Sequence, residues 1–510
     1  MLINHLSGQI GVIAALLLAL ATPLRLGAQI PVTAATELKK LSIPATSVGI
    51  HAVRIRDGRV TLSHQPDQPL QPASTLKVLT AIAALDMLGP THTGKVELRS
   101  AAPVESGVLK GDLILRGEAS PDFTWQELRE TLQSLRFAGI REIAGDVIVD
   151  RGYFSPTRLD EGLPPFDETP EFRYNVIPDA LLLNTNLHKL QLNDDGATLR
   201  INATPALDGV SFDAGAMIRS QRKCPDWEDG WKLPVLERTP DGRFIVRLQG
   251  DFPARCSTTT QISVLDRADF AARLIPALWR ELGGTLTGGV RESVARQTPL
   301  PANTRVLATH RSRTLAEVTR DINKRSDNPI TRLAFLTLGA TAPVSLGHRG
   351  DATTVERAEA RVRAWLRDRG VNDAGLVLDN GSGLSRTERA SAAQLVAALR
   401  IAHASDWAPE FITALPIAAT DGGLRNRYVG TLAARKARLK TGTLRNTWAL
   451  AGFAPDANGD MIALAVIIND DRGTGPTVRP ILDAIVLDIL ARHAAEAGDW
   501  PDRLTRESPG

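Results

Sequence analysis

Three short groups of residues carry the side chains that serine acyl transfer needs. They are the stretches Ser74-Thr-Leu-Lys77, Ser326-Asp-Asn328 and Lys440-Thr-Gly442. A serine hydroxyl is a weak nucleophile at neutral pH and needs a base within hydrogen-bond reach. A lysine can be that base where burial and neighbouring cations lower its pKa. The three groups, in this order, predict covalent catalysis by a serine with a lysine base.

The first group supplies the nucleophile and its base. Residues 74–88 are rich in Leu, Ala and Ile and end before a Gly-Pro pair, which predicts a helix with Ser74 at its start. Ser74 and Lys77 are three positions apart, so their side chains would share one face, and the N–H groups of the helix start would point at a developing oxyanion. Ser220 and Lys223 have the same spacing, but Cys-Pro follows directly and we expect a solvated turn there.

The other two groups offer a proton relay and a substrate site. Ser326 and Asn328 follow an expected helix over 315–324, and a polar loop there could present a hydroxyl and an amide. Lys440 opens an expected strand and, with the adjacent threonine hydroxyls, offers a site for a carboxylate. Gly442 would let a substrate backbone approach closely. Each group alone also fits a helix cap, a loop or an edge strand, so the catalytic interpretation depends on their conjunction.

Elements at both ends of the chain must position these residues. Residues 46–55 and 60–64 flank an Asp-Gly turn and predict a β-hairpin. Residues 446–453 and 461–469 predict a second hairpin, and 480–497 repeat apolar residues at helical spacing. We therefore expect both ends to build one antiparallel sheet flanked by helices.

The middle of the chain has a different pattern. Ser326 follows Ser74 by 252 positions, far more than one folding unit needs. Between residues 96 and 303 we expect β-rich inserted material, interrupted by one helix over 125–137. The expected strands include 108–115, 143–149, 187–192, 198–202 and 243–248.

Composition and cysteine usage narrow the function classes. The net charge of +3 over 510 residues, with no basic stripe, gives no case for nucleic-acid binding. Cys224 and Cys256 are the only cysteines, and in an exported chain we expect a disulfide between them. Two buried free thiols are the alternative. We expect no metal site at this pair, because no His or further Cys lies at ligand spacing nearby.

The N-terminus predicts export. Residues 10–21 are apolar or glycine, too short a run to span a bilayer comfortably, and Ala28 is a small residue that suits cleavage. We therefore expect a signal peptide over 1–28. No Lys or Arg precedes the apolar run, so an uncleaved segment associated weakly with the membrane surface is the alternative.

Taken together, the motifs resemble those of the class C low-molecular-mass penicillin-binding proteins, the D-alanyl-D-alanine carboxypeptidase/endopeptidases. The similarity runs through most of the chain, over residues 72–77, 111–113, 145–146 with Asp150 and Phe154, 323–328, 379–386, 421–424 and 440–444. The stretch Gly-Ser-Gly-Leu-Ser-Arg that ends at residue 386 is particularly specific to this group. One departure is Gly423, where the family usually has threonine.

The resemblance implies an α/β (α+β) fold, with a transpeptidase/β-lactamase-like catalytic domain interrupted by two nested, β-rich inserted domains. We expect the catalytic domain at residues 29–95 and 304–500, followed by a tail at 501–510. The first inserted domain would occupy 96–175 and 236–303, and the second 176–235.

The resemblance also implies roles for individual residues and no cofactor. Ser74 would attack the carbonyl of the penultimate D-alanine, or of a D-amino-acid cross-link, with Lys77 as its base. The backbone N–H groups of Ser74 and Thr443 would form the oxyanion hole. Ser326 and Lys440 would help to protonate the leaving amine. The substrate peptide and its terminal carboxylate would be held by Asn328, Thr441, Gly442 and Thr443.

The expected partners are peptidoglycan stem peptides in the periplasm and β-lactam antibiotics, which would acylate Ser74. A β-lactamase is the nearest enzymatic alternative, although such enzymes lack two inserted domains. A non-catalytic peptidoglycan-binding scaffold is the other. The sequence does not indicate whether the enzyme prefers carboxypeptidase or endopeptidase substrates, nor its oligomeric state.

Overall fold

The computed structural model describes residues 30–293, 303–343 and 352–492. The expected signal peptide at 1–28 and the tail at 501–510 lie outside the described residues. Within the described ranges, no helix is both long and apolar enough to cross a bilayer.

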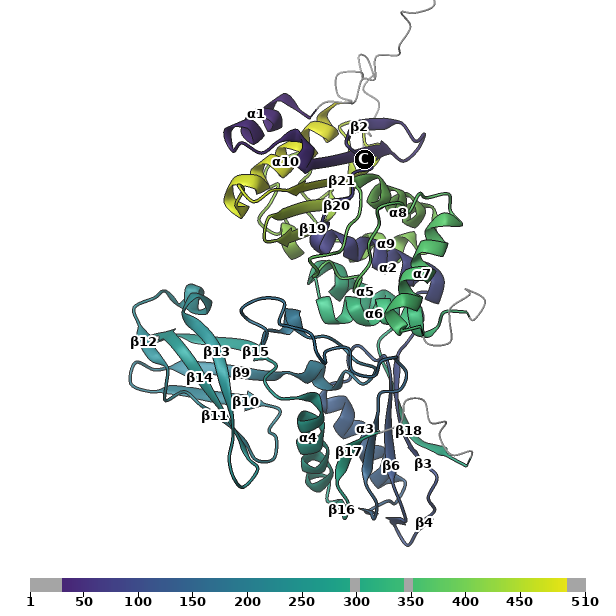
Figure 1. The fold of residues 1–510 in the computed structure, drawn as a ribbon, viewed down its shortest axis with the longest axis vertical. Helices are drawn as coiled ribbons and strands as arrows, with labels where there is room; N and C mark the ends of the chain where they lie inside the picture. Colours follow the sequence, from purple (N-terminus) through teal and green to yellow (C-terminus); the bar gives the residue numbers. More distant parts are fainter. Residues whose placement is uncertain (1–29, 294–302, 344–351, 493–510) are drawn as a thin grey trace, which may run out of the picture.

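Both ends of the chain build one five-stranded antiparallel sheet, in the order β19-β20-β21-β1-β2 (Figure 1). Its strands are β1 (Val48–Arg54), β2 (Val60–His64), β19 (Arg438–Leu444), β20 (Thr447–Pro455) and β21 (Met461–Asn469). Ile50 of β1 lies opposite Val466 of β21, so the N-terminal hairpin is joined in register to the C-terminal one. Both predicted hairpins are confirmed.

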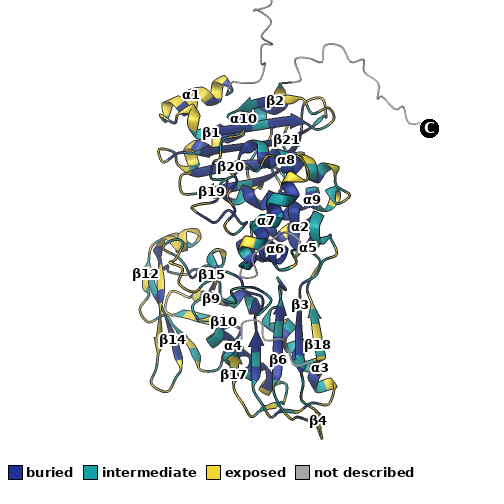
Figure 2. Ribbon diagram, turned by 45° about the vertical axis from the view of Figure 1, so that its right-hand side comes forward, coloured by how far each residue is buried: buried dark blue, intermediate teal, exposed yellow. Residues whose placement is uncertain are grey.

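Helices cover both faces of this sheet because its central strands are apolar on both sides (Figure 2). Along β21, Ala463 and Ala465 belong to one core, whereas Leu464 and Val466 belong to the other. The second core packs against α1 (Val32–Lys40) and α10 (Gly475–Ala491). The first is filled by α2 (Leu76–Leu88), α5 (Leu315–Lys324), α6 (Asn328–Ala340), α7 (Thr354–Arg367), α8 (Ala392–Ala404) and α9 (Ala408–Ala414).

A second five-stranded sheet, in the order β17-β8-β6-β3-β18, occupies the inserted part of the chain. Its strands are β3 (Lys95–Ser100), β6 (Leu113–Glu118), β8 (Val147–Asp150), β17 (Val290–Glu292) and β18 (Arg305–Arg311). A small neighbouring sheet contains β4 (Val104–Glu105), β5 (Val108–Leu109), β7 (Glu142–Ile143) and β16 (Thr285–Leu286). The chain thus adds β18 to the inserted sheet before it returns to the helices near the catalytic groups.

Two expected strands are broken where two Gly-Asp pairs cross. The stretches 108–115 and 143–149 each divide between the small and the large sheet. A Cβ on Gly145 would lie 2.5 Å from the carbonyl carbon of Gly111, so the two backbones touch. The Asp112 carboxylate accepts the Asp146 N–H at 2.8 Å, which fixes the crossing.

The expectation of a single helix between residues 96 and 303 is wrong. Besides α3 (Trp125–Phe137), which has the predicted bounds, the structure has α4 (Arg267–Glu281). Asp266 caps α4 by accepting the Ala268 N–H, and an apolar stripe that includes Phe270 is buried against the sheet. The sequence did not predict this helix because it contains an internal proline, Pro276, and proline is normally disfavoured in a helix interior.

Two further sheets lie beyond this sheet, to the left in Figure 1. One is three-stranded, with β9 (His188–Asp194), β10 (Leu199–Thr204) and β15 (Ser257–Ile262). The other contains β11 (Val210–Asp213), β12 (Ile218–Ser220), β13 (Trp231–Arg238) and β14 (Phe244–Pro253). They share a small core around Trp227, Trp231 and Phe252, and a disulfide between Cys224 and Cys256 closes this region.

Candidate active site

Ser74 and Lys77 lie together where a tight turn runs into a helix. Ser74 is in the 3-10 turn η2 (Ala73–Thr75), directly before α2, so it precedes the α-helix rather than forming part of it. Lys77, in the first turn of α2, is fully buried. Its Nζ donates to Ser74 Oγ at 3.0 Å, as the three-residue spacing predicts.

Lys77 has two other acceptors, and both come from distant segments. Its Nζ donates to Asn328 Oδ1 at 2.6 Å and to the Ser382 carbonyl at 2.5 Å. Burial, and then the positive charge of Lys440, lower the pKa of Lys77 well below its ordinary value. A neutral amine held against a serine hydroxyl can take the hydroxyl proton, so the setting suits a general base.

The Ser326-Asp-Asn328 group forms a strained turn into α6. Ser326 has φ +58°, a left-handed conformation that costs energy for a non-glycine residue. Asp327 caps α6 by accepting the Ile330 N–H at 2.9 Å, and Asn328 begins the helix. The turn is therefore held by α6 rather than being a free loop, and it directs Ser326 Oγ at Lys440.

Lys440 lies within β19, the edge strand of the central sheet, and not at its start as expected. Its buried Nζ donates to Ser326 Oγ at 2.9 Å and to the Thr441 carbonyl at 2.8 Å. Burial lowers the pKa of Lys440 to about 7. The charged and the neutral amine are therefore both accessible near neutral pH. Thr441 is half-buried and Thr443 is exposed on the same edge strand.

Gly442 is needed for a contact that the sequence did not indicate. A Cβ at this position would lie 2.7 Å from the Pro72 carbonyl oxygen and 3.1 Å from the Thr75 nitrogen. The glycine therefore lets β19 pack directly on the turn that holds Ser74. Gly423, the departure from the family pattern, is also close, since its Cβ would lie 2.5 Å from Thr441 Oγ1.

Sequence reasoning missed Glu388, which organises the third side of the site. This fully buried carboxylate accepts backbone N–H groups from residues 379, 380, 381 and 383, at 2.7–3.2 Å. The loop so formed presents the Ser382 carbonyl to Lys77 and the Gly381 carbonyl to Thr80 Oγ1. The only signal was the Gly-Ser-rich stretch before it, which identified the loop but not its acceptor.

The inserted part of the chain also supports the site. Arg173, in the 3-10 turn η3 (Arg173–Asn175), pairs with Asp327 at 2.8 Å. The Asn328 amide donates to the Tyr174 carbonyl at 2.9 Å, while its oxygen faces Lys77. The insertion thereby orients the Asn328 side-chain amide so that its oxygen, and not its nitrogen, faces Lys77.

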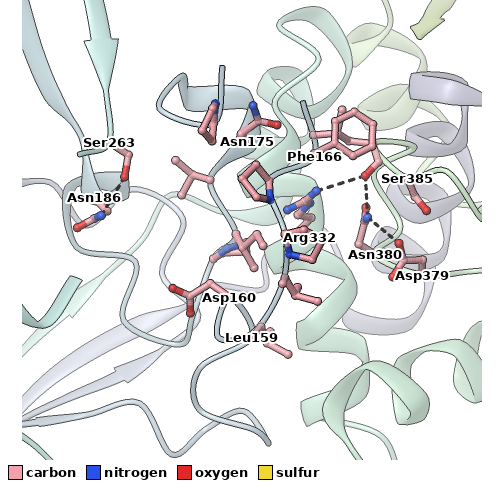
Figure 3. A pocket seen from close by; sticks show the side chains of 18 of the residues that line it. Leu159, Asp160, Phe166, Asn175, Asn186, Ser263, Arg332, Asp379, Asn380 and Ser385 are labelled. Carbon is pink, nitrogen blue, oxygen red and sulfur yellow. Dashed lines mark hydrogen bonds between the residues drawn. The ribbon is translucent and has the colours of Figure 1, made fainter. Parts of the chain in front are cut away.

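A cavity of about 660 Å³ is lined in part by the loop that Glu388 organises, through Asp379, Asn380 and Ser385 (Figure 3). Arg332, nine-tenths buried, lines it and donates to the Leu384 carbonyl at 3.3 Å, as does the Asn380 amide at 3.0 Å. Arg386 stacks over Phe166 at its edge, 4.3 Å from the ring centre. Neither Ser74 nor Lys440 lines this cavity.

The remaining predicted residues lie away from the site. Cys224 and Cys256 form the disulfide of the small outer core. Ser220 ends β12, and Lys223 is exposed beyond it. Among the described residues, no cluster of His, Cys, Asp and Glu is arranged to hold a metal ion.

The chain is similar to known proteins over most of its length. The model of the D-Ala-D-Ala carboxypeptidase 3 (S13) family matches residues 33–487. The chain is 29% identical to a D-alanyl-D-alanine carboxypeptidase of Actinomadura sp., over 88% of this chain and 82% of that protein. It is 25% identical to the D-alanyl-D-alanine carboxypeptidase DacB of Haemophilus influenzae, over 83% and 85% of the two chains.

The fold is shared with a solved structure. The crystal structure of penicillin binding protein 4 from Haemophilus influenzae superimposes with a TM-score of 0.72 at 24% identity, covering 90% of this chain and 98% of that one. A second structure of that protein is a complex with a β-lactam and has a TM-score of 0.68. The predicted α/β fold class is confirmed.

Proposed function

The chain belongs to the D-Ala-D-Ala carboxypeptidase 3 (S13) family of serine peptidases, and from this premise we propose that it hydrolyses peptidoglycan stem peptides through an acyl-enzyme on Ser74. The observation that carries the proposal is the set of contacts of Lys77. One buried amine touches Ser74, Asn328 and the Ser382 carbonyl. A serine nucleophile needs a base within hydrogen-bond reach, and this amine lies 3.0 Å from Ser74 Oγ.

In the proposed reaction, Ser74 Oγ forms a bond to the D-alanyl carbonyl carbon while its proton passes to neutral Lys77. The N–H groups of Ser74 and Thr443 stabilise the oxyanion. The C–N bond then breaks, and the amine leaves with a proton delivered through Ser326 from the Lys440 ammonium. Asn328, Thr441 and Thr443 hold the peptide and its carboxylate. Water hydrolyses the ester and regenerates Ser74.

Labelling with a fluorescent penicillin tests the nucleophile. We expect Ser74→Ala to abolish labelling and to lower the release of D-alanine from a pentapeptide by at least about 10³-fold. Ser220→Ala is the matched control, because Ser220 has the same spacing to a lysine, and it should label like the wild type. Labelling that survives Ser74→Ala would refute the assignment.

A β-lactamase and a non-catalytic scaffold are the alternatives. Hydrolysis of nitrocefin distinguishes the proposed peptidase from a β-lactamase. The peptidase forms a slowly hydrolysed acyl-enzyme and gives a stoichiometric burst, whereas a β-lactamase gives sustained turnover. A wild-type protein that is folded but takes up no penicillin would favour the scaffold.

We further propose that the chain acts in the periplasm after export. The proposal is supported by the apolar segment at the N-terminus and by the Cys224–Cys256 disulfide, which an oxidising compartment would preserve. Cell fractionation tests it, with activity in the cytoplasmic fraction as the contradicting result.

A further inference from the structure

A second hollow, of about 730 Å³, opens beside the turn that carries Ser326 and Asn328. One wall is this turn. The facing wall comes from inserted strands β9 and β15, through Lys189, Thr259 and Gln261. The hollow therefore joins the candidate active site to the outer inserted sheet, and it is called the outer groove below.

The position of Ser326 relates the outer groove to the leaving side of the reaction. If Ser326 protonates the leaving amine, that amine must lie within hydrogen-bond reach of Ser326 Oγ. Whatever is attached to the amine must then emerge next to Ser326, which lines the groove. A free D-alanine would occupy little of a 730 Å³ space, whereas the second peptide of a cross-link would need it.

The inserted wall of the groove is polar because alternate side chains of β9 and β15 face it. Burial alternates along β9, so that Lys189 and Gln191 are exposed while Leu190 and Leu192 are buried in the outer core. Lys189 is paired with Gln261 of β15, and Thr259 is the partner of Gln191. Residues on one face of paired strands form a continuous row, so a polar surface leads away from Ser326.

The charges of the groove favour an acidic peptide. Arg173 and Asp327 line it but pair with each other at 2.8 Å. The charged residues that remain are two cations, Lys189 and Arg325, and one acid, Glu228. Arg325 also contacts Asp321 at 3.3 Å, but its side chain is 79% exposed and free to reorient. Peptide carboxylates would be attracted to this surface.

We propose that the outer groove binds the acceptor peptide of a cross-linked substrate, meaning the acidic peptide whose amine is released. This inference rests on the proposed function. The bond that breaks joins the D-alanyl carbonyl carbon to that amine, and Ser74 Oγ replaces the nitrogen. The amine gains its proton through Ser326, and the freed peptide leaves along Lys189 and Gln261. The inserted sheet thereby adds endopeptidase specificity to a site that also releases D-alanine.

Kinetics on two substrates test the proposal with the full-length protein. We compare kcat/KM for cleavage of a purified cross-linked muropeptide dimer with kcat/KM for D-alanine release from the monomeric pentapeptide. Lys189→Glu reverses the charge on the inserted wall and leaves both lysines of the site, Lys77 and Lys440, unchanged. We expect at least a tenfold loss on the dimer and less than a twofold change on the monomer. Lys223→Glu is the matched control, since Lys223 is exposed on the same inserted region but does not line the groove.

Each outcome of these experiments either supports or refutes the assignment of the outer groove. An unchanged ratio for Lys189→Glu, or an equal loss for Lys223→Glu, would overturn the groove assignment. So would a wild-type protein that releases D-alanine but leaves dimers intact. A wild type that neither takes up penicillin nor releases D-alanine would instead refute the proposed function. Equal losses on both substrates would show that Lys189 acts on the common site and not on the acceptor.

Discussion

At the scale of single residues, the site depends on two buried lysines whose protonation must differ. In the proposed mechanism, Lys77 loses its proton to activate Ser74, whereas Lys440 keeps a proton that it later donates. Burial lowers the pKa of both, and the charge of Lys440 lowers that of Lys77 further. Pairs of titratable groups whose surroundings separate their pKa values are typical of acid–base catalysis.

The pKa of Lys440 predicts an alkaline limit to activity. Because this pKa is about 7, the ammonium is present below pH 7 and is lost as the pH rises through that value. We expect kcat/KM for D-alanine release to fall on the alkaline side with an apparent pKa near 7. Lys440→Arg should move that limb upward by more than one pH unit, because arginine stays charged. A limb that does not move would exclude Lys440 as its cause.

Glu388 makes a second prediction at this scale. Glu388→Gln keeps the shape but places an NH2 group against one of the four N–H donors, which should cost about 1–3 kcal/mol of stability. The carboxylate raises the pKa of Lys77, opposing burial and Lys440, so its removal should lower that pKa further. Protonation of Lys77 should limit the rate of penicillin acylation at low pH. This acid limb of the pH profile should then shift to lower pH. Loss of stability with an unshifted acid limb would assign Glu388 a purely structural role.

At the scale of elements, the site forms where three of them meet. The turn η2 brings Ser74, the strained turn before α6 brings Ser326, and the edge strand β19 brings Lys440. An edge strand has unpaired backbone groups, which suits it to bind an extended peptide. The contact between β19 and η2 sets how near that peptide comes to Ser74.

Gly442→Ala tests this contact. The added Cβ would lie 2.7 Å from the Pro72 oxygen, so the turn or the strand must shift. A displacement of about 1 Å at the nucleophile can cost about 10²-fold, and we expect a loss of that size in the rate of penicillin acylation. Gly289→Ala is the control, because its Cβ would meet no atom within 4 Å. A Gly442→Ala rate within threefold of wild type would contradict the argument.

At the scale of the whole molecule, one chain leaves the catalytic part, builds the inserted sheets and returns. We propose the domain division given above as the description of this path, with two boundaries corrected by the strand pairing. The strand β18, expected in the catalytic domain, pairs with β3 of the inserted sheet. The strands β14 and β15, expected in the first inserted domain, pair with β13 and β9 of the outer sheets. The insertions are not separate from the chemistry, because Arg173 pairs with Asp327 and the Tyr174 carbonyl orients Asn328.

The disulfide allows a test of how far the outer core influences the site. It spans 32 positions, and by the chain-entropy argument its removal should lower the free energy of unfolding by about 3–4 kcal/mol. We expect the Cys224→Ala/Cys256→Ala variant to melt at a lower temperature and still to be labelled by penicillin at 25 °C. A folded variant that has lost labelling would show that the outer core maintains the catalytic geometry.

The sequence by itself determined the nucleophile hypothesis, the two hairpins, the fold class and the presence of a long insertion. These follow from local spacing and from side-chain periodicity, which act within a few residues. The helix α4 was missed because Pro276 is a local signal that tertiary packing overrides.

Only the tertiary structure decided which distant groups meet. The Ser382 carbonyl, which the loop around Glu388 presents, contacts Lys77 across 305 positions. The groove between Ser326 and Lys189 exists only because the insertion folds back on α6. The spacing of residues along the chain does not predict such long-range contacts. They depend on how buried backbone donors find acceptors and how apolar faces pack, which only the complete fold specifies.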